Sequence, residues 1–512
     1  MINSGTSVGG RHGTRLKTAI LLACLTALAV SSAPAGLKDD FEDLKQAVEG
    51  VAGNDEAGKK KIDEVAESVL TPAEETVLGV AERSVELLQD YIRIKTINPP
   101  GKEINGALFL ASLLEEEGIE ARVLESAPGR GNLYARLRGN GEEPAIILLS
   151  HIDVVAADAT QWMVPPFDAV VRDGELFGRG ALDAKGVGMT QLLATIAIKR
   201  LGVPLKRDII LLATADEERG GRLGAKWMVD NHFGLFADAE FLLNEGGFIH
   251  RDEGKPLIYK LGVAEKSPCW FRIVASGDPG HASQPGPETA VTRLVDALYK
   301  LEHRKRTYEV GPVVAGYYAA YAAIDEEHAR QYRQLERSLE SQEFFDWFMG
   351  DPTAVALVTD TITPTVLTAS VKTNVIPAQA VAEVDSRLLP GHDCWSFLSS
   401  IRELVGGEHV TIESTGVNFP ATQSPMNTAL TEAVERVAAV EETKAVVLPA
   451  MLAGFTDSHY FRQKGIHSYG MVPMVVTASQ RASIHGPDER VSVEELKAAV
   501  SRMVKLLQEV GS

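Results

Sequence analysis

The stretch Ala145-Ile146-Ile147-Leu148-Leu149-Ser150-His151-Ile152-Asp153 decides the fold of this chain of 512 residues. It begins with an unbroken apolar run and ends in an imidazole and a carboxylate. Such a run is typical of a strand buried on both faces, as in parallel sheets covered by helices. Further apolar runs at 208–214 and 241–243 alternate with helical patterns at 186–201 and 224–231. This alternation predicts an α/β domain with a mainly parallel sheet covered by helices.

Chemically active side chains follow these strands. Open α/β sheets bind ligands at the carboxyl ends of their strands, so we expect these side chains to meet there. Two imidazoles and several carboxylates can hold a pair of divalent metal ions and leave one carboxylate as a base, which favours a hydrolase over a scaffold. The candidates are His151 and Asp153 after the first strand, Asp183 after the glycine-rich loop 178–180, Glu217 and Glu218 after the second strand, Glu245 after the third, and His485 near the C-terminus.

Each signal has a plainer interpretation when it is taken alone. His-x-Asp at 151–153 is compatible with a loop cap, and Asp183 with the N-cap of the following helix. Glu217-Glu218 is compatible with a solvated acidic turn, although adjacent carboxylates in one site repel unless a cation or proton separates them. His281 and His485 lie in loop-like segments, where surface histidines are common.

The rest of the chain divides into segments of different pattern. After residue 260, two β–α–β runs predict a smaller α+β domain inserted into the larger one, as a lid or dimerisation domain. Residues 307–360 do not fit a compact insert and are interpreted as an added helical segment. The expected division is a signal peptide at 1–35, a charged helical N-terminal extension at 36–70, the first part of a catalytic domain at 71–260, the inserted domain at 261–415, and the second part of the catalytic domain at 416–512.

The N-terminus predicts export. Arg11, Arg15 and Lys17 precede an apolar run at 18–30, which is too short to span a bilayer, and small residues suitable for cleavage follow it. We therefore expect a secreted or periplasmic protein without a stable membrane span after signal cleavage. An uncleaved N-terminal anchor is the alternative.

Charge and cysteine content narrow the partners. The net charge of −19 disfavours a nucleic-acid or anionic-membrane partner. Cys269 and Cys394 are the cysteines outside the predicted signal peptide. They could pair in an oxidising compartment, but two isolated buried thiols are the favoured interpretation.

In combination, these motifs resemble the M20 family of metallopeptidases, from about residue 70 to the C-terminus. The resemblance is strongest from His151 through Trp162, Pro165-Pro166-Phe167, Asp173-Gly174 and Gly178-Arg179-Gly180 to Asp183 and Lys185-Gly186, and again at Asp216-Glu217-Glu218. The segment Asn244-Glu245-Gly246-Gly247-Phe248 and the secretory start are most similar to the secreted branch related to aminoacylase-1 and carboxypeptidase S, which acts on N-acyl amino acids. Many relatives have Asp where this chain has Ala184 and Asn244.

The resemblance implies a role for each candidate. The implied metal ligands are His151 and Glu245 for one ion, Glu218 and His485 for the other, and Asp183 between them. Glu217 is implied as the base, Asp153 as the partner that orients His151, and His281 of the insert as the oxyanion-stabilising group, often across a dimer. The implied substrate-binding residues are Asn374, Arg387 and Gly454, the last in the loop Gly454-Phe455-Thr456-Asp457-Ser458.

The implied activity is that of a dinuclear metal-dependent amidohydrolase or exopeptidase. It would cleave N-acyl amino acids or C-terminal residues of small peptides through a metal-bridged hydroxide and the Glu217 base. Imidazole and carboxylate ligands suit two Zn²⁺ ions per chain, with Co²⁺ or Mn²⁺ as replacements. The expected partners are a small N-acyl amino acid or peptide substrate and a second copy in a homodimer. The alternatives are a dipeptidase of the same family and a non-catalytic ligand-binding protein that retains the fold.

Overall fold

The computed structural model describes residues 71–511. The predicted signal peptide at 1–35 and N-terminal extension at 36–70 lie outside the described residues. Among the described residues, no helix combines the length and the apolar character that a membrane crossing requires.

The apolar run at 145–149 forms most of strand β3 (Ala145–His151) in an eight-stranded sheet. All residues of β3 are buried. Ile146 and Leu148 belong to the hydrophobic cluster on one face of the sheet, and Ile147 and Leu149 belong to the cluster on the other. The strand is therefore buried on both faces, as the unbroken apolar run predicted.

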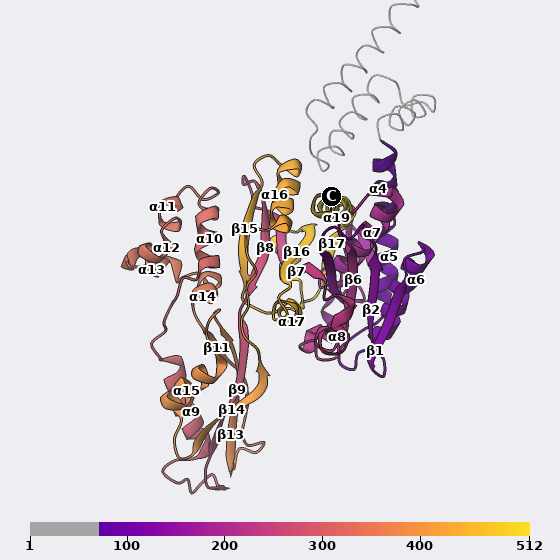
Figure 1. Ribbon diagram of the computed structural model, residues 1–512. Helices are drawn as coiled ribbons and strands as arrows, with labels where there is room; N and C mark the ends of the chain where they lie inside the picture. Colours follow the sequence, from indigo (N-terminus) through magenta and orange to yellow (C-terminus); the bar gives the residue numbers. More distant parts are fainter. Residues whose placement is uncertain (1–70, 512) are drawn as a thin grey trace, which may run out of the picture.

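The large sheet is mainly parallel in its centre (Figure 1). Its order is β1 (Ala121–Ala127), β2 (Arg130–Leu137), β6 (Ile209–Thr214), β3, β7 (Ala239–Arg251), β16 (His467–Val475), β8 (Leu257–Glu265) and β15 (Val446–Leu452). Strands β6, β3, β7 and β16 run parallel, and β15 runs parallel to β8. Strands β1 and β2 are antiparallel to each other, and β2 is antiparallel to β6. The predicted fold class is confirmed, and the carboxyl ends of the central strands meet at one edge.

Helices cover both faces of the large sheet. One face carries α4 (Pro72–Glu82), α5 (Ser84–Arg93), α7 (Lys185–Leu201) and α19 (Val493–Gly511), with α7 against β3 and α19 against β16. The other face carries α8 (Ala225–His232) and α17 (Ser458–Arg462). Helix α6 (Glu103–Glu116) packs against β1 and β2, and α16 (Ala429–Glu441) packs against α19 and β15.

The first described helix has a capped start and is followed directly by a second helix. Thr71 caps α4 in a reciprocal pair of hydrogen bonds with Glu74, and Pro72 occupies the first helical position. The chain leaves the regular helix at Arg83 and restarts as α5. No proline marks this break, so the local pattern did not reveal it.

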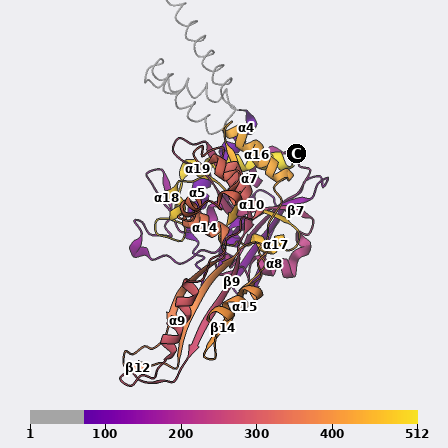
Figure 2. The same ribbon diagram turned by 90° about the vertical axis from the view of Figure 1, so that its left-hand side faces the viewer.

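A smaller antiparallel sheet extends away from the large one (Figures 1 and 2). Its order is β11 (Thr361–Thr368), β13 (Gln379–Leu388), β9 (Ser267–Ser276) and β14 (Val410–Asn418). Helices α9 (Ala290–Glu302) and α15 (Cys394–Val405) pack with it around a separate hydrophobic core. A two-stranded ribbon of β10 (Gly280–His281) and β12 (Val375–Ile376) lies at its far tip (Figure 2).

A disulfide joins the two cysteines of the small sheet and its helix. Cys269 lies in β9 and Cys394 begins α15, and their Cα atoms are 5.4 Å apart. The interpretation of two isolated thiols is therefore wrong. The packing of α15 over β9 brings together cysteines that are 125 residues apart in the sequence.

The helical residues 312–358 share the core of the large sheet. They form α10 (Pro312–Tyr321), α11 (Ala329–Tyr332), α12 (Leu335–Ser338), α13 (Gln342–Phe348) and α14 (Pro352–Val358), and α10 packs against β15. Val314, Tyr318 and Phe348 belong to the large cluster rather than to the core of the small sheet. Residues 329–348 contain three short helices. Strand β8 also continues past residue 260, where the sequence pattern changes.

Candidate functional site

Three predicted site residues lie at the carboxyl edge of the large sheet. His151 is the last residue of β3, Glu217 begins the short 3₁₀ helix η2 (Glu217–Arg219) after β6, and Glu245 lies in β7. Strands β6 and β7 are the two neighbours of β3, and all three are parallel. The order of the strands therefore brings these side chains to one place.

Glu245 lies inside its strand, so the prediction that it follows the third strand is wrong. Strand β7 continues through Gly246 and Gly247 to Arg251. Gly246 has a φ of 103°, which only glycine adopts readily, and a Cβ atom on Gly247 would lie 2.4 Å from the carbonyl oxygen of Gly470. This close approach of β7 and β16 accompanies the register shift beside Glu245.

Asp183 lies between the two predicted histidine ligands. Its Oδ1 atom is 2.9 Å from His151 Nε2, and its Oδ2 atom is 3.1 Å from His485 Nε2. Asp183 does not cap the following helix, because α7 begins at Lys185 and its N-cap position is Ala184. One carboxylate oxygen toward each imidazole is the arrangement that a bridging metal ligand requires.

The remaining glutamates surround the same point. Glu218 Oε2 lies 3.1 Å from His485 Nε2, and Glu245 Oε1 lies 3.6 Å from His151 Nε2. Two groups of potential ligand atoms lie within 4.8 Å of one another, namely His151 with Asp183 and Glu218, and His151 with Glu217 and Glu245. Imidazole nitrogens with carboxylate oxygens form a donor set that fits zinc and similar divalent ions.

Asp153 holds both the first histidine and the turn of the glutamates. Its buried carboxylate accepts hydrogen bonds from the backbone N–H of Glu217 at 3.1 Å and of Glu218 at 3.2 Å. Its backbone carbonyl lies 2.9 Å from Nδ1 of His151. Since a carbonyl only accepts, Nδ1 carries a proton and Nε2 faces the other ligands, which is the orientation metal binding needs. Asn98 Nδ2 also donates a hydrogen bond of 2.8 Å to Asp153 Oδ2.

Without a cation, the histidines hold protons for the carboxylates around them. Burial lowers the pKa of His151, but the charge of Glu245 and the other acidic neighbours outweighs burial and raises it well above its usual value. Hydrogen bonds to Asp183 and Glu218 raise the pKa of His485 to about 10. In the metal-free chain, the positive charge of these two imidazolium groups offsets the surrounding carboxylates, as divalent cations would.

The carboxylates show the same crowding of charge. Burial first, and then the charge of Glu245, raises the pKa of Glu217 well above its usual value. Burial raises the pKa of Glu245 to about 7. Burial would also raise the pKa of Asp183, but its hydrogen bonds to the two histidines lower it well below the usual range. Several carboxylates that cannot all ionise unaided fit a site that holds cations.

His281 and Asn374 lie away from this cluster in the same chain. His281 is exposed in β10 and pairs with Val375 of β12, and Nδ1 of His281 lies 2.7 Å from Oγ of Ser283. The carbonyl of Asn374, just before β12, accepts a hydrogen bond from the backbone of Ala282. Both residues therefore lie at the tip of the small sheet (Figure 2), and the structure does not bring them to the metal-ligand cluster.

Arg387 and Gly454 lie nearer the junction of the two sheets. Arg387 in β13 forms two hydrogen bonds with Asp385. Its guanidinium carbon also lies 5.5 Å from the ring of Trp270 and 5.0 Å from the ring of Phe455. Gly454 is exposed in the loop that carries Phe455. The cation of Arg387 is therefore already paired and stacked.

Sequence reasoning missed three buried polar residues around the cluster. Asp457 accepts a hydrogen bond from Thr214 Oγ1, and burial raises its pKa well above the usual value. Asn98 links Asp153 to the carboxylate of Asp216. Glu489 contacts the loop of Asp183. Only Asp457 lies inside one of the motifs named above, and none of the three carried a signal beyond its residue type.

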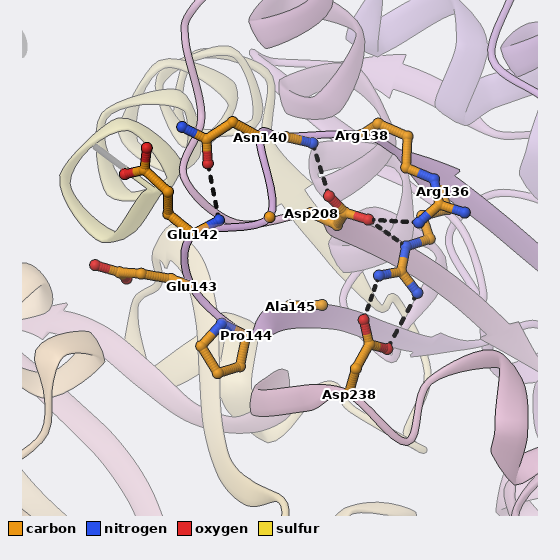
Figure 3. A pocket seen from close by; sticks show the side chains of 11 residues that line it. Arg136, Arg138, Asn140, Glu142, Glu143, Pro144, Ala145, Asp208 and Asp238 are labelled. Atoms are coloured by element: carbon orange, nitrogen blue, oxygen red, sulfur yellow. Dashed lines mark hydrogen bonds and ion pairs between the residues drawn. The ribbon is translucent and has the colours of Figure 1, made fainter.

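A surface pocket lies at the opposite edge of the large sheet (Figure 3). Its walls include Ala145 and Asp208, which lie at the amino ends of β3 and β6. Arg136 forms ion pairs with both Asp208 and Asp238, so these three charged side chains of the pocket neutralise one another. Among the described residues, no histidine, serine or cysteine lines it.

A parallel α/β sheet that gathers two imidazoles and several carboxylates at its carboxyl edge defines a metal-dependent hydrolase. The chain belongs to the peptidase family M20/M25/M40, which matches residues 147–509. Members of this family hydrolyse amide or peptide bonds, so the predicted family and enzyme class are confirmed.

Two known proteins are similar to the chain in sequence, and a solved structure is similar in fold. The chain is 27% identical to N-fatty-acyl-amino acid synthase/hydrolase PM20D1 of Xenopus tropicalis, over 85% of this chain and 87% of that protein. It is 27% identical to Aminoacylase-1 of Homo sapiens, over 84% of this chain and 95% of that protein. Its fold is similar to that of the M20 family metallo-carboxypeptidase Sso-CP2 of Sulfolobus solfataricus. The TM-score is 0.63 and the sequence identity 20%, over 83% of this chain and 99% of that protein.

Proposed function

We propose that the chain is an exported dizinc amidohydrolase that cleaves N-acyl amino acids or removes C-terminal residues from small peptides. The observation that carries this proposal is the position of Asp183 between His151 and His485, with one oxygen toward each imidazole. Glu245 completes one ligand set and Glu218 the other. Co²⁺ or Mn²⁺ are replacements that the same donors accept.

The chain's own side chains supply the remaining chemistry. When bound, the two metals lower the pKa of a water molecule towards neutrality and polarise the carbonyl group of the substrate. Glu217 then takes the proton of that water and returns it to the leaving amine. Asp153 keeps Glu217 in reach through its hydrogen bond to the backbone of the turn.

The assignment of Glu217 to proton transfer rests on the resemblance as well as on geometry. Glu217 belongs to one of the two potential ligand groups, together with His151 and Glu245. We assign Glu218 as the ligand because its carboxylate lies 3.1 Å from His485, which Asp183 also contacts. With Glu218 as the metal ligand, the adjacent Glu217 is free for proton transfer.

The substrate proposal rests on the names of the similar enzymes and on one charged group. The relatives named above are an N-fatty-acyl-amino acid synthase/hydrolase and an aminoacylase. Arg387, Asn374 and Gly454 are proposed to bind the substrate, with Arg387 facing its carboxylate. Because Asp385 already pairs with Arg387, the substrate carboxylate would have to share or displace that partner.

A homodimer would supply His281 and Asn374, which one chain leaves at the tip of its small sheet. We keep the division into a catalytic domain and an inserted lid or dimerisation domain as part of this proposal. Helix α9 of the insert exposes Val291, Val295 and Tyr299 at a spacing of four residues, which forms an apolar stripe. Strand β11, at the edge of the small sheet, exposes Val366 and Leu367. Both features suit contact with a second copy.

Export is supported by the disulfide. The bond between Cys269 and Cys394 belongs to an oxidising compartment, since disulfides rarely persist in a reducing cytosol. The basic and apolar N-terminal residues add the sequence argument for a signal peptide.

The test is a substrate panel on protein stripped with a chelator and reloaded with Zn²⁺. We expect two metal ions per chain by elemental analysis and hydrolysis of N-acyl amino acids in preference to dipeptides. Preference for dipeptides would favour the dipeptidase alternative. Two bound metals without hydrolysis of any panel member would favour the non-catalytic alternative.

A further inference from the structure

The loop that carries Asp183 is held by one buried carboxylate. Glu489 is fully buried, and its two oxygens accept four hydrogen bonds. Oε1 accepts from the backbone N–H of Leu182 at 2.9 Å and of Asp183 at 3.0 Å. Oε2 accepts from the backbone N–H of Gly180 at 3.0 Å and from Arg179 Nη1 at 2.6 Å.

The same contacts reach the loop of the second histidine. Glu489 follows His485 by four residues, so its carboxylate ties the His485 loop to the Asp183 loop. Arg179 adds a second tie, because its Nη2 atom donates to the carbonyl of Gly486 at 2.9 Å. The backbone N–H of Gly178 also donates to the carbonyl of Glu489 at 2.8 Å.

A third loop covers this connection. The ring of Trp162 lies 5.3 Å from the guanidinium carbon of Arg179, which is 2% exposed. The backbone N–H of Met163 donates to Oδ1 of Asp488 at 2.8 Å. Trp162 and the glycine-rich loop stood out in the sequence without any chemical role in the proposed reaction. The glycine-rich loop contacts Glu489 and the ring of Trp162 lies over Arg179, so both belong to one set of contacts.

We propose that Glu489 and Arg179 are positioning residues that hold Asp183 and His485 at the separation needed to bind metal. This inference rests on the proposed function, because it assumes that these two residues are metal ligands. Neither positioning residue belongs to the ligand groups themselves. They act through the backbone on which the ligands are carried, and groups that orient ligands in this way are worth about 10–100-fold in metal affinity.

The test replaces Glu489 with its neutral isostere. In Glu489→Gln, the amide nitrogen takes the place of one carboxylate oxygen and faces two N–H donors, so two of the four hydrogen bonds are lost in either orientation. We expect the metal affinity of chelator-treated protein to fall about 10–100-fold in a competition titration with a chromophoric chelator. The absorption spectrum of the Co²⁺-loaded variant should change as well, because the ligand geometry relaxes.

The matched control is Glu175→Gln. Glu175 lies in β5 (Glu175–Phe177), and its carboxylate bonds to Arg490, beside Glu489, and to Gln480 instead of to the Asp183 loop. This variant should leave the metal affinity and the Co²⁺ spectrum unchanged. Glu489→Asp keeps the charge on a shorter side chain and should lie between the wild type and Glu489→Gln. If Glu489→Gln does not fold, Glu489→Asp decides by the same criterion.

The outcomes separate this inference from the proposed function. Wild-type protein with two metals and a Glu489 variant of unchanged metal affinity would overturn the positioning role alone. The positioning role also fails if only the thermal midpoint of the metal-free variant falls, since that indicates a purely structural ion pair. Wild-type protein that binds no metal would overturn the proposed function and the inference with it.

Discussion

Replacing Glu217 with glutamine separates proton transfer from metal binding. The substitution is isosteric and removes the carboxylate that is assigned as the base. The hydrogen bond between Asp153 and residue 217 involves the backbone N–H, so the turn should keep its shape. We therefore expect Glu217→Gln to retain two metals per chain.

The expected loss lies in turnover. A general base contributes about 10²–10⁴-fold, which corresponds to about 2.7–5.4 kcal/mol of activation free energy. The kcat for an N-acyl amino acid should fall by that factor. Metal content should be measured on the same samples by elemental analysis.

Glu218→Gln is the matched control for this prediction. Its backbone N–H also donates to Asp153, at 3.2 Å, but its carboxylate lies beside His485. We expect this variant to lose metal as well as activity. Near-wild-type turnover of fully metallated Glu217→Gln would refute the base assignment. Metal loss in Glu217→Gln with metal retained in Glu218→Gln would exchange the two roles.

Three further variants test the ligand bridge, the dimer and a buried imidazole. Asp183→Ala should lose both metals and the stabilisation of the fold that they provide. That stabilisation is about 4 kcal/mol at a metal concentration 1,000 times the dissociation constant. If elemental analysis finds two metals in this variant, Asp183 is not the bridging ligand. His281→Ala should bind metal normally, with kcat reduced about 10²–10³-fold. If His281 acts across subunits, mixed dimers of this variant with Glu217→Gln should regain part of the activity. No recovery in verified mixed dimers would exclude that arrangement. Burial lowers the pKa of His459 from 6.5 to about 3, so the unfolded chain binds the extra proton and stability is lost as the pH falls from about 6.5 towards 3. His459→Phe should remove a slope of about 1.4 kcal/mol per pH unit from the unfolding free energy of metal-free protein, and an unchanged slope in denaturant titrations would contradict the burial argument.

The amino-acid sequence by itself determined the α/β class and the neighbourhood of the cluster. The apolar run at 145–149 has the pattern of a strand buried on both faces, and His151 follows it closely. Since parallel strands end at one edge, residues after successive strands such as Glu217 were expected beside His151. These inferences depend on local patterns and on a general rule of sheet topology.

Only the tertiary structure decided which distant residues meet. The disulfide between Cys269 and Cys394 and the packing of helices 312–358 on the large sheet both join segments far apart in the chain. Such contacts follow from how whole elements pack, and a local pattern carries no record of its distant partner. Glu489 shows this most clearly, because its four hydrogen-bond donors lie on another loop and its own sequence context does not point to them.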